Sequence, residues 1–227
     1  MGYMMQPQSQ NPDPEAINIR SRGYLPHWTA QDGTYFVTFR LFDSLPRSVL
    51  DDYKFERENI IITAKQIKRK LTDAEKQRVK ELYEEKIERS LDARAGACYL
   101  HNPKIAGLIA DALRHFHGTR YQLFAWCVMP NHVHVLVQPA AGHELEDILH
   151  TWKSYTAHEA NKILKRTGAF WQREYYDHLI RNEEDFVNHI DYVLKNPSVA
   201  RLKDWKWIWS AFSDCKDDFQ LQRRQIS

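Results

Sequence analysis

The stretch YQLFAWCVMPNHVHVLVQP, residues 121–139, decides the fold because it contains two strands and the turn between them. Residues 121–129 and 132–139 are rich in aromatic and β-branched side chains, and Pro130-Asn131 favours a turn, so a β-hairpin is predicted. Successive side chains of a strand point to opposite faces, which places His132 and His134 side by side on one face. Either these imidazoles are partly exposed passengers, or together they hold a ligand.

The segments around the hairpin predict further strands and helices. We expect a strand in 33–42, a helix in 102–118, a long helix in 144–164, an extended segment in 169–180 and a last helix in 182–197. The order strand, helix, hairpin, helix, strand predicts an α+β fold, an antiparallel sheet with helices packed on one face. Pro197 is expected to end the last helix near Asn196.

The chain is expected to form one domain over residues 23–212, between an N-terminal tail (1–22) and a C-terminal tail (213–227). Residues 47–97, about half of them charged, have helical spacing and predict a helical insertion. A solvated helical hairpin is the simpler interpretation of this insertion, and an arm that binds a partner or DNA is the alternative.

Composition excludes several classes of protein. Hydrophobic residues make up 43% of the chain, which is enough for a sizeable core, and a net charge of +2 does not by itself indicate nucleic acid. The three cysteines form no CxxC pair, which excludes a disulfide scaffold and fits a reducing compartment. With no signal peptide and no membrane span expected, the sequence predicts a soluble, cytoplasmic protein.

The last predicted helix places a tyrosine and an asparagine outside its apolar stripe. At 100° per residue, Tyr192 lies away from the stripe, and Asn196 follows it four residues later on the same face. If this helix packs against His132 and His134, two imidazoles and an amide oxygen could hold a divalent cation with open positions. An amphipathic surface tyrosine is the alternative interpretation.

A cation beside Tyr192 would make its phenol reactive. The free phenol has a pKa near 10, and a nearby cation favours the phenoxide while it polarises a phosphate. The chemistry expected of such a site is in-line attack by Tyr192 on a phosphodiester. The resulting phosphotyrosine keeps the bond energy, so the strand can be rejoined without ATP.

Two blocks of sequence carry a family resemblance. WCVMPNHVHVLVQP (126–139), followed by FWQREYYDHLIRNEEDFVNHIDYVLKNP (170–197), closely resembles the REP-associated tyrosine transposases, relatives of the single-tyrosine insertion-sequence transposases among the HUH endonucleases. The resemblance implies a ferredoxin-like fold, dependence on Mg²⁺ or Mn²⁺, and action on single-stranded DNA near hairpins. It makes Tyr192 the nucleophile that forms a 5′-phosphotyrosine and releases a 3′-OH. His132 and His134 become the metal pair, with Asn196 where the third ligand lies.

Several alternatives stay open beside this assignment. Tyr155, Tyr175 and Tyr176 are competing nucleophiles, and Tyr155 is expected to pack in the core. His178 either approaches the site or is structural, and His189 is a reserve ligand. A hydrolase that activates water with zinc or manganese, or a non-catalytic module that binds hairpin DNA or RNA, would also use such a fold. The oligomeric state, monomer or homodimer, is left open.

Residues 151–181 contain six Lys or Arg against three acidic residues, which suits a groove that follows phosphates. We expect Lys153, Arg173 and Arg181 to contact DNA because they flank the predicted site, with Trp152 and Trp171 interleaved. The aromatic residues of WKWIW (205–209) could stack on bases, but such a stripe more often seals a core.

Overall fold

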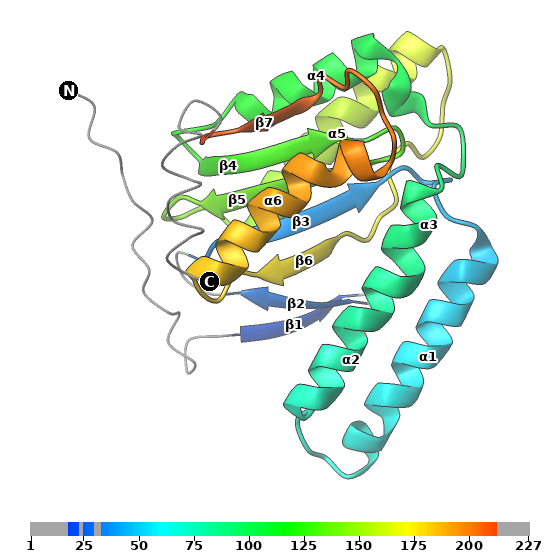
Figure 1. The fold of residues 1–227 in the computed structure, drawn as a ribbon, viewed down its shortest axis with the longest axis vertical. Helices are drawn as coiled ribbons and strands as arrows, with labels where there is room; N and C mark the ends of the chain where they lie inside the picture. The colour runs from blue at the N-terminus through cyan, green and yellow to red at the C-terminus, as the bar shows by residue number, and fades with distance from the viewer. Residues whose placement is uncertain (1–17, 23–24, 30–32, 213–227) are drawn as a thin grey trace.

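The computed structural model describes residues 18–22, 25–29 and 33–212, and the sheet at its centre has five strands (Figure 1). Every neighbouring pair is antiparallel, in the order β6 (Tyr176–Leu179), β3 (Tyr35–Arg40), β5 (His132–Pro139), β4 (Tyr121–Val128) and β7 (Ile208–Ser210). The chain runs β3, α4, β4, β5, α5, β6, so the core of the sheet has the βαββαβ connectivity of ferredoxin-like folds. The predicted α+β fold is therefore confirmed.

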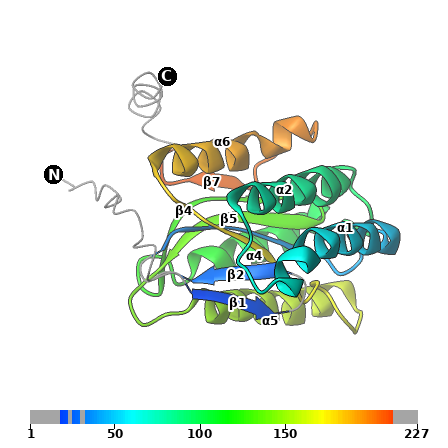
Figure 2. The ribbon, with the colours of Figure 1, turned by 90° about the horizontal axis from the view of Figure 1, so that it is seen from below.

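Helices cover both faces of this sheet (Figure 2). The helices α4 (Pro103–Arg114) and α5 (Leu145–Leu164) pack on one face, as expected, and α6 (Glu183–Val199) lies on the other face. Strand alternation decides which residues meet which helices. The core under α4 and α5 includes Val133, Val135 and Val137. His132 and His134, which alternate with these valines, face the α6 side.

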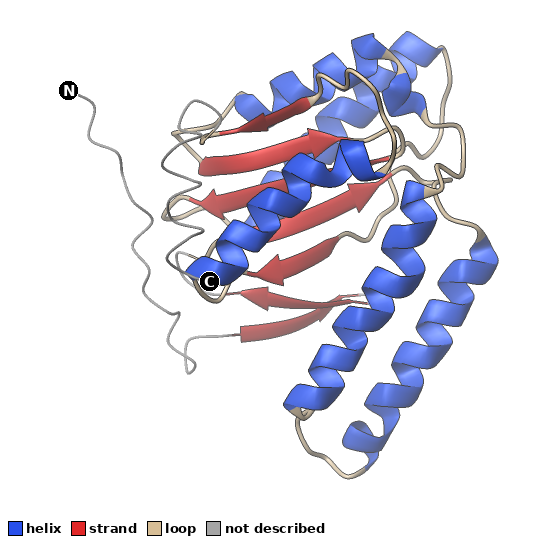
Figure 3. Cartoon of the chain, in the orientation of Figure 1, coloured by secondary structure: helices blue, strands red, loops and turns tan. Residues whose placement is uncertain are grey.

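The charged segment forms a pair of helices that projects from the sheet, as Figure 3 shows. It comprises α1 (Arg47–Gln66), α2 (Asp73–Tyr83), a π-helical turn (Glu84–Glu88) and α3 (Arg89–Asp92). A separate small core holds the helices together and consists of Leu45, Tyr53, Leu82, Tyr83, Ile87 and Leu91. The segment therefore has an apolar interior of its own despite its surface charge.

Both ends of this helical segment are attached to the turn of the β4–β5 hairpin. The amide of Leu41 donates to the carbonyl of Asn131 at 2.9 Å, and the amide of Leu100, in the short 3₁₀ helix Tyr99–His101, donates to that of Pro130 at 3.1 Å. The Asn131 side chain also donates to the carbonyls of Leu91 and Ala95, each at 3.1 Å. The turn before His132 thus fixes the position of the helical segment.

Three expectations differ from the structure. The helix α6 continues through Pro197 to Val199, because Pro197 is buried and the backbone carbonyl of Asn196 still accepts from the amide of Ala200. Tyr155, expected in the core, is 53% exposed, since it lies on the solvent side of α5. Residues 1–17 of the expected N-terminal tail (1–22) lie outside the described residues. The last five residues of that tail form β1 (Asn18–Arg22), which pairs with β2 (Leu25–Thr29).

The predicted C-terminal tail, 213–227, also lies outside the described residues. In the part of the chain that the structure covers, no helix is long and apolar enough to cross a membrane. The aromatic residues of 205–209 contribute to the cores on both faces of the sheet, where β7 pairs with β4, so the core interpretation of this stripe is confirmed.

Candidate active site

His132 and His134 form a buried pair in the middle of the sheet. Each side chain is 1% exposed, and their Nε2 atoms face one another at 2.9 Å. They come from the central strand β5 and lie on the side covered by α6, as the alternation predicts. The sequence pattern therefore brings two imidazole nitrogens within the distance at which they could share one ion.

The outer nitrogen of each ring has a partner that controls its proton. Asn131 donates through Nδ2 to two carbonyls, so its Oδ1 accepts from His132 Nδ1 at 2.7 Å and leaves His132 Nε2 as a bare acceptor. His134 Nδ1 lies 2.8 Å from Thr38 Oγ1, a hydroxyl that can donate or accept. The pair can thus form an N–H···N hydrogen bond or direct both lone pairs at one cation.

Burial keeps both rings uncharged. It lowers the pKa of His132 to about 3 and the pKa of His134 well below its usual value, with the neighbouring His132 and His189 adding to the second effect. Neutral imidazole is the form that binds metals, so both rings are ready to act as ligands at neutral pH.

Asn196, the third ligand that the sequence predicts, lies one turn beyond Tyr192 on α6. It is 3% exposed, and its Oδ1 is buried without a hydrogen-bond partner. A buried amide oxygen without a partner costs free energy, so such an atom indicates a ligand. Two nitrogens about 2.1 Å from one ion and at right angles would lie about 3.0 Å apart, close to the separation of the two histidines. The two imidazoles therefore fit a divalent cation, and the Asn196 oxygen has no protein partner that would compete for it.

Tyr192 lies beside the histidine pair. Its ring meets that of His134 edge to face, with the centroids 5.2 Å apart, and Phe36 contacts both rings. The sequence placed Tyr192 outside the apolar stripe of its helix, and the structure shows it half-buried against the core under α6. A phenol and two imidazoles thus converge from α6 and β5, segments about 60 residues apart in sequence.

A second histidine cluster adjoins the first and contains a carboxylate. The Asp185 carboxylate lies 2.8 Å from His178 Nε2 and 3.1 Å from His189 Nδ1, and the two rings stack with centroids 4.7 Å apart. His189 Nδ1 also lies 2.7 Å from the backbone carbonyl of Asp185. Ligand atoms of these three residues lie within 4.8 Å of one another, which is compatible with a metal ion. Burial opposes ionisation of Asp185, but the hydrogen bonds from His178 and His189 outweigh it and lower the pKa of the carboxyl.

The residues expected to contact DNA have different environments. Lys153 is partly buried and donates to the carbonyl of Arg173 at 2.6 Å, while the side chains of Arg173 and Arg181 are exposed. Trp152 and Trp171 do not line a groove, because both are buried and donate to Tyr121 Oη and Thr156 Oγ1. These two tryptophans therefore serve the core.

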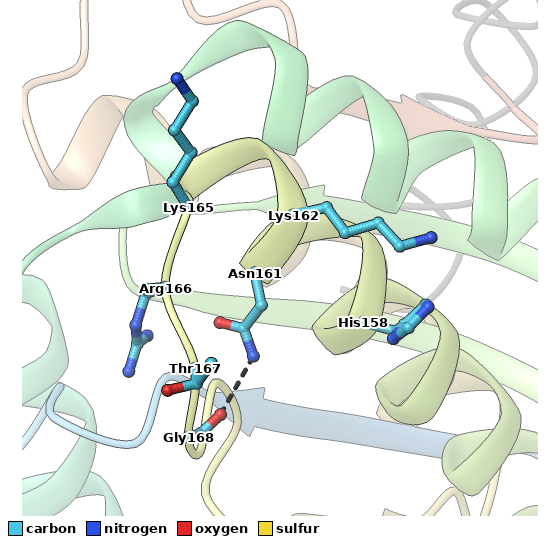
Figure 4. Close-up of a pocket in the computed structure, with 7 residues that line it drawn as sticks. All are labelled: His158, Asn161, Lys162, Lys165, Arg166, Thr167 and Gly168. Carbon is cyan, nitrogen blue, oxygen red and sulfur yellow. Dashed lines mark hydrogen bonds between the residues drawn. The ribbon is translucent and has the colours of Figure 1, made fainter.

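Another basic group surrounds a pocket of about 560 Å³ at the C-terminal end of α5 (Figure 4). The lining residues are His158, Asn161, Lys162, Lys165, Arg166, Thr167 and Gly168. Asn161 closes the loop by donating to the carbonyl of Gly168 at 3.0 Å, and Lys162 pairs with Glu159. This pocket holds no member of either histidine cluster, so it offers charge and no catalytic group.

Phe36, Thr38 and Asn131 also belong to the site, although only Asn131 was noted in the sequence, as a turn residue. Phe36 and Thr38 share the histidine face of β3, and Thr38 lies directly opposite His134 in the register. The alternation of the segment 35–40 was visible in the sequence, but its pairing with β5 was not. Asn131 could have been assigned to the site, since it directly precedes the histidine pair in the turn.

Comparisons with known proteins support the resemblance seen in the sequence. The family model described as "Transposase IS200 like" matches residues 104–194, which include both histidines and Tyr192 but not Asn196. The REP-associated tyrosine transposase of Escherichia coli is 27% identical over 89 residues, covering 37% of this chain and 52% of that protein. A Haemophilus influenzae protein that carries the same name provisionally is 29% identical over 101 residues, covering 38% of this chain and 57% of that protein.

The chain thus spans little more than half the length of the curated relatives it matches. Among solved structures, a REP-associated tyrosine transposase bound to a REP hairpin aligns with a TM-score of 0.44 and 18% identity, over 83% of this chain and 80% of that one. The similarity of residues 104–194 to IS200-like and REP-associated transposases is therefore confirmed.

Proposed function

We propose that this protein, similar over residues 104–194 to the IS200-like transposases, is a metal-dependent single-strand DNA transposase with Tyr192 as its nucleophile. The observation that carries the proposal is the convergence of Tyr192 with His132 and His134. One turn further along α6, the buried amide oxygen of Asn196 has no partner. If these residues only stabilised the fold, the buried Asn196 oxygen would be expected to accept a hydrogen bond, because buried polar atoms in folded proteins almost always have a partner.

The proposed reaction exchanges one phosphodiester for another. Tyr192 Oη attacks the phosphorus as the bond to the 3′ oxygen breaks, which gives a 5′-phosphotyrosine and a free 3′-OH. The phenol loses its proton and the leaving oxygen gains one, so no external energy source is consumed. Attack by a 3′-OH on the phosphotyrosine reverses the exchange and rejoins DNA.

His132, His134 and Asn196 would hold the ion, which we propose to be Mg²⁺ or Mn²⁺. When bound, the cation supplies charge that stabilises the phenoxide and the phosphate oxygens. Asn131 and Thr38 hold the two rings in the orientation that directs Nε2 inward. Phe36 covers His134 and Tyr192, which excludes water from this side of the site.

Single-stranded or hairpin DNA is the proposed partner. The structural relative named above is bound to a REP hairpin, and Lys153, Arg173 and Arg181 belong to the basic segment that flanks the site in this chain. We propose that these three side chains contact the DNA phosphates. Action on chromosomal DNA would place the protein in the cytoplasm.

The deciding experiment incubates the full chain with labelled single-stranded DNA that contains hairpins, with Mn²⁺ or a chelator. We expect a protein–DNA adduct that survives denaturation, requires the metal and disappears in Tyr192→Phe. Tyr155→Phe is the matched control, because Tyr155 is an exposed tyrosine on α5 and should leave adduct formation unchanged.

Other outcomes would redirect the proposal. Cleavage without an adduct, retained in Tyr192→Phe, would identify a hydrolase that activates water. Hairpin binding without cleavage in any metal, and unaffected by loss of His132 and His134, would identify a binding module. An adduct retained in Tyr192→Phe but lost in Tyr175→Phe or Tyr176→Phe would transfer the nucleophile to the extended segment.

A further inference from the structure

Arg40 is a buried cation directly beside the histidine pair. It ends β3, lies opposite His132 in the strand register and is 8% exposed. Directly opposite residues of an antiparallel pair have Cβ atoms roughly 5 Å apart, so Arg40 shares a face and an edge with His132. Arg40 therefore starts beside the proposed cation site, and its side chain extends to Ser44 and to a cavity under the helical segment. Its strand precedes the residues matched by the transposase family.

No carboxylate neutralises this guanidinium among the residues that the structure describes. Its hydrogen bond is to Ser44 Oγ, at 3.3 Å, and the Ser44 hydroxyl itself donates to the carbonyl of Leu41. A buried charge is expensive unless it is paired, and guanidinium groups match the oxygens of phosphates. The environment of Arg40 therefore favours the binding of an anion.

The helical segment encloses the space in front of Arg40. A cavity of about 50 Å³ is lined by Thr38, Arg40, Leu50, Tyr53, Lys54, Tyr83, Ile87, Gln172, Glu174, Tyr175 and Tyr176. One water needs roughly 10–15 Å³ of such volume, so the cavity admits a few waters or one tetrahedral oxyanion but no nucleobase. Its size is thus sufficient for a phosphate group.

Tyr53 provides a second polar group without a partner in this cavity. Its side chain is buried, and its hydroxyl has no hydrogen-bond partner. Burial, partly offset by Arg57, raises the pKa of Tyr53 to about 12, so the hydroxyl keeps its proton and can donate it in a hydrogen bond. Two donors, one charged and one neutral, therefore line the same small space from β3 and from α1.

The surrounding charges also favour an anion. Lys54 lines the cavity. Burial lowers the pKa of Lys153 to about 8, and the nearby charge of Arg40 adds to this effect. Glu174 is the acidic residue of the lining, and it acts on Lys153 in the opposite direction. The charged residues of the lining are Arg40 and Lys54 against Glu174, so the lining itself has one excess positive charge.

We propose that Arg40 and Tyr53 bind one phosphate group of the DNA strand whose neighbouring phosphodiester lies at the histidine pair. The inference rests on the proposed function and adds a subsite to it. It also gives the helical segment a role, because Tyr53 belongs to α1 and the segment forms one wall of the cavity.

The test measures binding of single-stranded DNA to the full chain carrying Tyr192→Phe, with a chelator, so that no cleavage occurs. A set of oligonucleotides replaces one phosphate at a time with a neutral methylphosphonate. One position should weaken binding roughly ten- to a hundredfold, the effect of losing a hydrogen bond between charged groups. That position should have no effect in Arg40→Gln, which itself binds unmodified DNA more weakly by a similar factor.

Two further variants separate a ligand role from a structural one. Tyr53→Phe removes a hydroxyl without a partner, so it should weaken DNA binding while the melting temperature stays the same or rises. Arg47→Gln is the matched control, since Arg47 is an exposed arginine on the same helical segment and should leave the methylphosphonate pattern unchanged.

The outcomes are distinct. If the protein binds no single-stranded DNA, the proposed function is wrong and the subsite with it. If DNA binds and the Tyr192 adduct forms, but Arg40→Gln shows the same methylphosphonate pattern as the parent, only the subsite is wrong. A lower melting temperature in both Arg40→Gln and Tyr53→Phe, without any change in DNA affinity, would also overturn it.

Discussion

Two histidine pairs lie on the α6 side of the sheet, and they differ in how their polar atoms are satisfied. His178 and His189 share the carboxylate of Asp185, which also accepts from the backbone amide of Arg181. His132 and His134 face each other with no acid between them. His178 and His189 thus have their polar partners within the protein. His132 and His134 lack the charge that a cation would bring, so they are the better candidates for metal ligands.

The largest expected effect separates the two pairs by metal binding. His134→Gln should raise the dissociation constant for Mn²⁺ by more than the roughly 10- to 100-fold that loss of a supporting residue costs. His178→Gln, at a similarly buried histidine, should leave that constant within about twofold, because its ring bonds to Asp185. Calorimetric titration of both variants measures this, and equal losses would remove the distinction between the pairs.

Asp185→Asn should reverse the pattern, with a large effect on folding and a small one on metal. It removes the charged acceptor for two imidazoles and one amide, so the free energy of unfolding should fall by about 2–3 kcal/mol. Denaturant titration measures the loss. A variant that kept its stability but lost Mn²⁺ affinity would instead identify His178, Asp185 and His189 as the metal ligands.

The pH dependence of stability should show the same difference. The pKa values of His132 and His134 are lowered in the fold, so the unfolded chain binds more protons below pH 6.5 and stability falls as the pH drops. For the metal-free protein, the two rings should cost about 2 kcal/mol between pH 6.5 and 5.5. Asp185, whose pKa is lowered, contributes stability that is present above about pH 3.8 and is lost only in stronger acid.

Thermal unfolding in buffers from pH 7 to 5, with chelator, would follow this loss. Replacing both His132 and His134 by glutamine should flatten the profile in that range. A profile equally steep in the double variant would assign the titration to other groups.

The smallest effect concerns the residue that orients His132. Asn131→Ala should weaken Mn²⁺ binding about tenfold, because His132 Nδ1 loses its acceptor and the ring its fixed orientation. Asn102→Ala is the control: Asn102 caps α4 by accepting from the amide of Lys104, so its loss should cost about 1 kcal/mol of stability and leave metal affinity unchanged. Identical metal affinity in both variants would show that Asn131 only anchors the helical segment.

Local patterns predicted the elements of this fold well. The period of two in β5 placed both histidines on one face, and the spacing of four placed Tyr192 and Asn196 together on α6. Both patterns are consequences of backbone geometry within one element, so the sequence alone suffices for them. The expected start of the last helix at residue 182 is confirmed, since Asn182 caps α6 by accepting from the amide of Asp185.

The rest depends on contacts between distant segments. Thr38 contacts His134 across 96 residues, and Arg40 lies opposite His132 only because β3 pairs with β5 in one register. The prediction that Tyr155 packs in the core was wrong for a related reason. Which residues at the edge of an apolar stripe are buried depends on the element that packs against the helix, and this position of α5 is exposed. Pro197 was expected to end α6, but tertiary packing adds a last turn beyond it.

The attachment of both ends of the helical segment to one turn has an evolutionary consequence. Leu41 and Leu100 bond to adjacent carbonyls of residues 130 and 131, so the chain leaves the sheet and returns to it at the same place. A lineage could lengthen, shorten or exchange everything between these two points without breaking a single hydrogen bond of the strand ladder. The chemistry would then be inherited with the sheet, while the helical segment diversified at its own rate.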